Sequence, residues 1–85
     1  MKFFFAKTDS LYKIFKSLEK IPAHRNVEIF IDPEHSLFDN EWRWWQIKDI
    51  IEKNQIDATF VTKNKKIEII YNQFDSKLII KNRSI

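Results

Sequence analysis

Four side chains that could bind a metal ion or move a proton follow the first two apolar runs of this sequence. They are Asp9, Asp32, Glu34 and His35. Carboxylate oxygens are the ligands that Mg²⁺ prefers in proteins, and a histidine changes its charge near neutral pH, which suits acid–base work. With Lys63 as a further cation, these residues would supply a small magnesium-dependent phosphoryl-type site.

Each of these residues also has an ordinary structural use. Asp9 stands in a Thr-Asp-Ser cluster that is typical of a helix N-cap, and Asp32-Pro33 is a common way to end a strand. Asp32 and Glu34 alternate along an extended segment and could share a side, but the sequence specifies no third ligand beside them. We therefore favour the structural interpretation and keep the metal site as an alternative.

The absence of two residue types excludes several classes of site. The chain of 85 residues contains no glycine and no cysteine. Phosphate-binding loops need glycine because the backbone must approach the anion closely. A Walker loop, a dinucleotide fingerprint and the nucleophile elbow of the hydrolases are therefore excluded, and so are disulfides, thiolate metal sites and a cysteine nucleophile. We expect no cofactor and no enzymatic activity.

The elements that position these residues are predicted from the apolar runs. A chain of 85 residues holds a single domain, residues 1–85, because a second core would not fit. β-branched and aromatic runs predict strands at residues 2–6, 27–31 and 58–62, and helical spacing predicts helices at about 11–21 and 41–54. The order β-α-β-α-β favours parallel pairing with right-handed crossovers.

The last third of the chain is compatible with two arrangements. Four apolar residues between 67 and 74 follow helical spacing, whereas residues 67–71 also read as a strand. We favour the helix, because the spacing continues to residue 74, and place a closing strand at residues 77–81. The fold is then a small α/β domain with a mainly parallel four-stranded sheet and three helices, in two or three layers. A hairpin through residues 64–76 would give a β-α-β-α-β-β-β mixed sheet instead.

Three tryptophans in the second predicted helix are the first candidates for an interaction surface. On a helical wheel Trp44 falls on the arc that faces the sheet, while Trp45 falls on the opposite, charged arc with Trp42 beside it. Exposed tryptophans favour a covering partner, so Trp42 and Trp45 are the predicted anchors of a protein interface. For these residues we favour the structural interpretation, in which the preceding loop through Leu37 and Phe38 buries Trp42 and leaves Trp45 half exposed.

Two lysine-rich segments are the candidates for nucleic-acid binding. The predicted contacts are Lys63, Lys65, Lys66, Lys81 and Arg83. With a helical tail these residues could lie on one edge of the sheet and contact phosphates there. The net charge of +3 gives this only weak support, because the basic residues are spread along the chain.

A looser pattern runs from the second strand into the second helix. It consists of Asp32, Pro33, Glu34, His35, Phe38, Asn40, Trp42 and Gln46, followed by the strand at residues 59–62. This pattern resembles an uncharacterised β-α-β-α-β-α-β domain of candidate-phylum bacterial proteins, over most of the chain. The chain departs from it by lacking the glycine after the tryptophans and the one before the last strand. The resemblance implies the fold and no activity.

We therefore expect a non-enzymatic protein-interaction module, as a homo-oligomer or an accessory subunit. The partner is a protein or a second copy of the chain. Nucleic-acid binding is the first alternative and the magnesium site the second. We expect a cytoplasmic location and no contact with a membrane, because the chain has no signal-like segment and no apolar run approaches the ~18 residues that span a bilayer.

Overall fold

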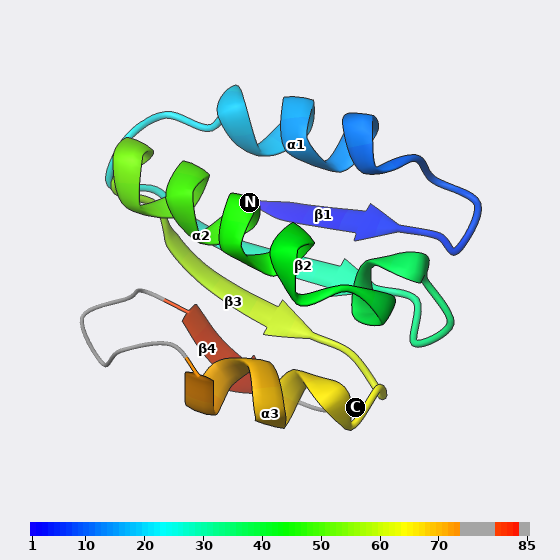
Figure 1. The fold of residues 1–85 in the computed structure, drawn as a ribbon. Helices are drawn as coiled ribbons and strands as arrows, with labels where there is room; N and C mark the ends of the chain where they lie inside the picture. Colours follow the sequence, from blue (N-terminus) through cyan, green and yellow to red (C-terminus); the bar gives the residue numbers. More distant parts are fainter. Residues whose placement is uncertain (74–79, 84–85) are drawn as a thin grey trace.

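The computed structural model describes the backbone of residues 1–73 and 80–83 and the side chains of residues 1–70. Strands and helices alternate along this part of the chain (Figure 1). In chain order the elements are β1 (Lys2–Phe5), α1 (Leu11–Glu19), β2 (Asn26–Ile31), the 3-10 helix η1 (Ser36–Asp39), α2 (Glu41–Asn54), β3 (Asp57–Val61), α3 (Lys66–Gln73) and β4 (Ile80–Arg83).

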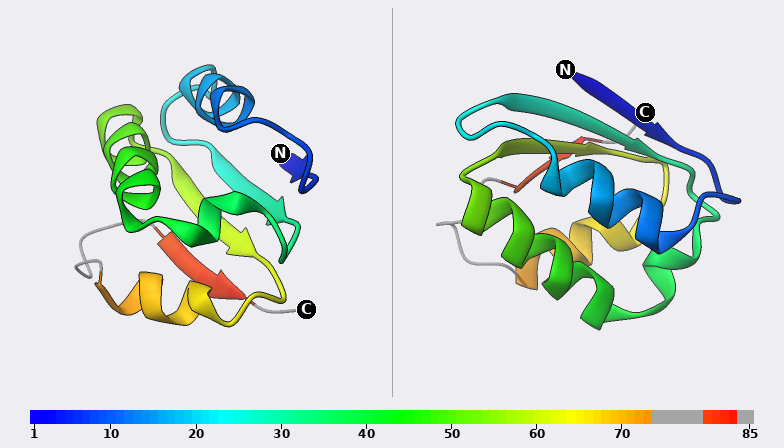
Figure 2. Two further views of the ribbon diagram at one scale, coloured as in Figure 1. Left: turned by 45° about the vertical axis from the view of Figure 1, so that its right-hand side comes forward. Right: turned by 90° about the horizontal axis from the view of Figure 1, so that it is seen from above.

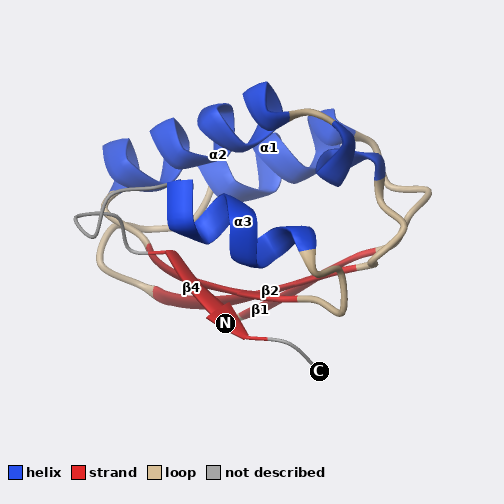
Figure 3. Ribbon diagram, turned by 60° about the horizontal axis from the view of Figure 1, so that its bottom comes forward, coloured by secondary structure: helices blue, strands red, loops and turns tan. Residues whose placement is uncertain are grey.

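The strands pair in parallel, in the spatial order β1-β2-β3-β4. Figures 2 and 3 show that α1, α2 and α3 all lie on the same side of the sheet. Right-handed crossovers produce this arrangement whenever the strand order never reverses. The described part of the chain therefore has two layers, and the second face of its sheet carries no helix.

The α/β class, the three helices and the parallel pairing of β1, β2 and β3 are confirmed. The mixed-sheet alternative is wrong, because residues that a hairpin would need belong to helix α3, whose Ile67 and Ile70 are buried. The closing strand predicted at residues 77–81 falls partly on residues 77–79, which lie outside the described part. Strand β4 begins at Ile80 and pairs in parallel with β3.

Side-chain caps fix where the two longer helices begin. The Ser10 hydroxyl accepts a hydrogen bond of 3.1 Å from the backbone N–H of Lys13, at the start of α1. The Asn40 side chain accepts one of 2.9 Å from the N–H of Trp42, at the start of α2. Each cap satisfies a backbone donor that has no partner inside its own helix. The polar residues before positions 11 and 41 therefore cap the two helices, as their sequence pattern predicts.

Two residues in the left-handed region replace glycine at the amino edge of the sheet. Gln55, which ends α2, has a φ of 54°, and His24 in the connection to β2 has a φ of 64°. The N–H of His24 donates a hydrogen bond of 2.9 Å to the carbonyl of Gln55. This conformation costs a residue with a side chain about 1 kcal/mol or more. The left-handed conformation is tolerated here because the hydrogen bond between His24 and Gln55 stabilises both turns.

The core lies between the helices and the covered face of the sheet. At its centre the Trp44 ring packs edge-on against Phe60, with centroids 5.1 Å apart, and at 5.5 Å from Phe38. The core residues of the strands alternate with residues on the open face. The buried apolar cluster comprises Phe5, Ile14, Leu18, Ile21, Val27, Ile29, Ile31, Leu37, Phe38, Trp44, Ile47, Ile51, Ile56, Ala58, Phe60, Ile67 and Ile70.

Candidate functional site

The open face of the sheet carries a polar row and an apolar row that run across the strands. Strand register aligns Lys2, Glu28 and Thr59 in the polar row. The next row along the strands, toward their carboxyl ends, aligns Phe4, Phe30 and Val61. Strand β4 continues both rows in its backbone register, with Lys81 beside Thr59 and Arg83 beside Val61. We call these two rows the open face.

Two phenylalanines form a ridge on this face. The rings of Phe4 and Phe30 stack with centroids 4.7 Å apart and planes 13° from parallel. Two rings lying flat on the sheet side by side would be coplanar and could not approach this closely, so these rings overlap face to face. Phe4 nevertheless remains 69% exposed. The ridge therefore presents ring edges and the outer face of Phe4, rather than a flat aromatic platform.

A shallow depression of 590 Å³ follows the ridge toward the carboxyl edge of the sheet. Its floor is apolar and includes Phe4, Phe30 and Val61. Its lining includes both signs of charge, with Asp9, Asp32 and Lys63. This mixed lining is suited to contact with a polar protein surface around an apolar centre.

His35 is a structural residue in this fold. Its ring is 2% exposed, and both nitrogens are used. The N–H of Leu37 donates to His35 Nδ1 at 2.9 Å, so Nε2 bears the proton and donates to the carbonyl of Asp9 at 2.7 Å. With neither nitrogen available to a substrate, His35 does not have the acid–base role that the sequence left open. It joins the β1–α1 connection to the start of η1.

The three carboxylates of the predicted metal site also have local partners. Asp9 accepts from the N–H of Ala6 at 2.8 Å and pairs with Lys13 Nζ at 3.0 Å. The hydrogen bond from Lys13, followed by that from Ala6, lowers the pKa of Asp9 from its ordinary value of 3.8. Asp32 accepts from the N–H of Glu34, which in turn pairs with Lys7.

These interactions argue against the predicted metal site in the described part of the chain. Within that part of the chain, no three histidine, aspartate or glutamate side chains converge closely enough to hold a metal ion. The set of Asp9, Asp32, Glu34 and His35 therefore does not form the predicted centre. The physical reason is that each member already has a partner within the protein: Asp9 and Asp32 cap nearby turns, Glu34 pairs with Lys7, and His35 bonds the carbonyl of Asp9.

The three tryptophans separate as the helical wheel predicts. Trp44 is buried, Trp42 is 76% exposed, and Trp45 is 38% exposed with Lys48 Nζ 4.4 Å from its ring centre. The favoured expectation that the preceding loop buries Trp42 is wrong, because Leu37 and Phe38 are buried in the core instead. Trp42 and Trp45 thus form a second apolar surface, on the helix side of the molecule.

The first basic segment follows strand β3, and the second lies on its neighbour β4. Lys63, Lys65 and Lys66 follow β3 and are exposed. In the backbone register of β4, Arg83 lies beside Val61, two residues before Lys63. The side chains of Lys81 and Arg83 lie outside the described part. The backbone therefore brings both segments to the same side of the sheet, as the helical tail predicts.

Sequence reasoning missed the ridge of Phe4 and Phe30. The signal was present, since continuous apolar runs such as Phe3–Phe4–Phe5 are typical of parallel strands that are covered on both faces. The missing information was the strand order, which decides whether helices cover one face or both.

Comparison with known proteins adds no assignment. No protein-family model matches the chain, and neither a curated protein nor a solved structure matches it. The resemblance to an uncharacterised bacterial domain therefore stays a prediction. Among the described residues, no helix is long and apolar enough to cross a membrane.

Proposed function

We propose that this chain is a non-enzymatic protein-interaction module whose open face binds a protein surface, with a second copy of the chain as its partner. The observation that carries the proposal is a parallel sheet whose described part has no helix over one face, on which Phe4 at the edge strand is largely exposed while Val61 in the same row is buried. Parallel sheets occur almost only where both faces are covered. Here one face has no helix in the described part of the chain, and Phe4 stands on it 69% exposed.

The residue pattern of the strands supports a covering partner at the apolar row. Residues 3–5 of β1 and residues 29–31 of β2 are apolar without interruption. A strand with one face in water alternates apolar and polar residues instead. The polar row, by contrast, has the composition of a solvated surface. The carboxyl half of the open face therefore resembles an interior surface, and its amino half the rim of an interface.

The form of the ridge favours a protein over a nucleic acid as the partner. A base stacks on the face of an aromatic ring. Because Phe4 and Phe30 cover one face of each other, the ridge offers a base the outer face of Phe4 and no broader platform. A ridge of ring edges packs well between the side chains of a facing sheet, as in aligned sheet-on-sheet packing. A second copy offers such a sheet. The polar row contains both Lys2 and Glu28. Two facing copies therefore do not present charges of a single sign to each other, and electrostatic repulsion between them is small.

The size of the open face sets the expected affinity. Four strands of about five residues span a projected area of roughly 300 Å², from the usual strand spacing and rise. Two such faces bury less than the ~1,600 Å² of a standard interface. We therefore expect weak, concentration-dependent dimerisation, with a dissociation constant above the micromolar range.

Analytical ultracentrifugation from micromolar to millimolar concentration tests the proposal. The wild-type chain should shift from monomer to dimer, and Phe4→Ser should remain monomeric with an unchanged circular dichroism spectrum. Trp42→Ser is the matched control, since it removes an equally exposed aromatic ring from the helix side. If Trp42→Ser abolishes dimerisation and Phe4→Ser does not, α2 is the interface. A wild-type chain that stays monomeric at millimolar concentration refutes self-association.

A nucleic-acid-binding domain is the second candidate, and one observation favours it. The exposed Lys63, Lys65 and Lys66 follow β3 directly, and the backbone of Lys81 and Arg83 runs beside that strand. Phosphate contacts from such a cluster would make binding strongly dependent on salt. Binding of a labelled single-stranded oligonucleotide that falls steeply between about 50 and 200 mM salt would support this function. No binding at the lower salt concentration would exclude it.

A further inference from the structure

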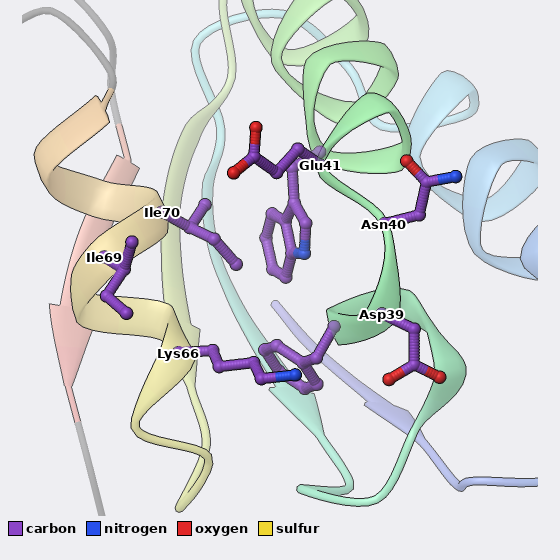
Figure 4. A pocket seen from close by; sticks show the side chains of 8 residues that line it. Asp39, Asn40, Glu41, Lys66, Ile69 and Ile70 are labelled. Carbon is purple, nitrogen blue, oxygen red and sulfur yellow. The ribbon is translucent and has the colours of Figure 1, made fainter.

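The helix side of the molecule has a hollow whose lining does not favour one ligand. It has a volume of 280 Å³ and lies between η1, the first turn of α2, and α3 (Figure 4). Asp39 and Glu41 line it together with Lys66, so charges of both signs meet there. Ile69 and Ile70 add an apolar wall. The edge of the sheet, by contrast, presents polar groups whose geometry is fixed by the backbone.

Strand β1 forms one edge of the sheet and pairs there with β2 alone. In a parallel pair, alternate residues of a strand bond to the neighbouring strand. The carbonyls of Met1 and Phe5 accept hydrogen bonds of 2.9 and 3.0 Å from the N–H groups of residues 28 and 32, so the odd-numbered residues face β2. The N–H and C=O groups of Lys2 and Phe4 therefore point outward from the edge of the sheet.

These outward groups have no backbone partner within the described part of the chain. An edge strand of this kind is a template on which another extended chain can pair. Proteins commonly block such an edge with a proline or a bulge. β1 contains no proline, and its register with β2 is continuous from residue 2 to residue 5. The backbone therefore specifies the occupant of this edge as an extended segment.

The side chains beside the edge set the alternation of that segment. Phe3 is partly buried against the core and stacks on Phe5, with centroids 6.2 Å apart, on the helix side of the sheet. Lys2 and Phe4 are exposed on the open face. Side chains that lie opposite each other on neighbouring strands make contact. An added strand should then place apolar residues toward Phe3 and charged residues toward Lys2.

The charge of the first two elements indicates an acidic partner. Residues 1–20 contain five lysines against Asp9 and Glu19, a net charge of +3 that equals the net charge of the whole chain. The remaining residues are neutral in sum. Lys2 on β1 and Lys7 just after it are both exposed. Complementary charge steers association and selects between partners, so a segment that carries carboxylates suits this edge.

A second copy of the chain does not suit the same edge. Two β1 edges would bring together segments of equal positive charge. In Figure 1, α1 lies beyond β1 on the side away from β2, and Figure 2 shows it in the helix layer. Two copies paired through β1 would therefore bring their α1 helices into the same space. A single extended segment brings no second helix.

We propose that the outer edge of β1 binds an extended acidic segment of a partner protein, which pairs with the backbone of Lys2 and Phe4 and extends the sheet by one strand. Acidic side chains of the segment lie beside Lys2 on the open face, and apolar ones lie beside Phe3 on the helix side. The new hydrogen bonds lie in the plane of the sheet, so the segment leaves the open face accessible. This binding is separate from self-association and does not depend on it.

Titration with a synthetic peptide of alternating glutamate and valine tests the proposal. The ¹⁵N-labelled wild-type chain is kept at micromolar concentration, where self-association through the open face is not populated. The peptide should slow hydrogen exchange of the Phe4 amide roughly tenfold once its concentration is ten times its dissociation constant. The amides of Phe3 and Phe5, which face β2, should change much less. A Phe4 amide that exchanges equally fast with and without millimolar peptide would overturn strand addition.

Two variants at residue 2 separate backbone pairing from charge. Lys2→Ala removes the ammonium group and should weaken binding about two- to fivefold, as for an exposed ion pair. Lys2→Pro also removes an outward N–H that β2 does not use, and should weaken binding by roughly a further fivefold. Equal affinity of these two variants, with circular dichroism spectra that match the wild type, would overturn backbone pairing. A peptide of alternating lysine and valine that binds as tightly would overturn the choice of an acidic segment.

Discussion

The two faces of the sheet are made by the same strands but have opposite environments. On the covered face Val27, Ile29 and Phe60 are almost fully buried beneath the helices. On the open face, one residue along in each strand, Phe4 is largely exposed, Phe30 is partly exposed, and Val61 is buried. Both faces contain large apolar residues in their carboxyl half. Amino-acid type alone therefore does not decide burial; the positions of the crossovers do.

The largest expected contrast between the faces is in stability. Phe60→Ala should lower the free energy of unfolding by about 3–5 kcal/mol, because it leaves a cavity beside Trp44. Phe4→Ala should cost well under about 1 kcal/mol, because its ring is mostly in water. Urea unfolding of both variants measures the difference. Equal losses would mean that the open face is covered in solution and that the contrast is wrong.

The next largest effect separates a structural histidine from a functional one. His35→Ala should destabilise the chain by about 1–3 kcal/mol, because the carbonyl of Asp9 and the N–H of Leu37 both lose a buried partner. Thermal unfolding checks this, with His24→Ala as the control at the other histidine. A His35 variant as stable as the wild type would show that these contacts do not hold the carboxyl edge together.

A gain in stability is expected where the backbone is left-handed. Gln55→Gly should raise the free energy of unfolding by roughly 0.5–1 kcal/mol, since glycine accepts positive φ without steric cost but loses more entropy on folding. The neighbouring Asn54 is the last residue of α2 and is helical, so Asn54→Gly should instead lower stability, by about 0.3 kcal/mol. Chemical denaturation distinguishes the two signs. The same sign for both variants would contradict the strain at Gln55.

The smallest effect concerns acid stability. The lowered pKa of Asp9, set mainly by the Lys13 hydrogen bond, means that the folded chain keeps this carboxylate ionised to lower pH than the unfolded chain. Its contribution is therefore present above the ordinary pKa of 3.8 and is lost as the pH falls through the lower folded value. Asp9→Asn should flatten the loss of stability below about pH 4. An unchanged acid profile would show that the pair is not formed in solution.

Much of the fold follows from local sequence pattern. The caps before α1 and α2, the inward position of Trp44 and the helix at residues 66–73 could all be predicted, because each depends on nearby residues. The uncovered face could not be predicted, because it depends on the strand order. The role of His35 also escaped, since its partner at Asp9 lies far along the chain.

The sequential order of the strands has a consequence for how the chain folds. Each strand pairs with the strand that comes next along the chain, as from Lys2 to Glu28 and from Asn26 to Asp57. No strand is inserted between two others that have already formed. The entropy of loop closure is therefore lost in separate steps of similar size, and contacts remain closer along the chain than in a sheet whose order reverses. Such a chain can grow its sheet one unit at a time.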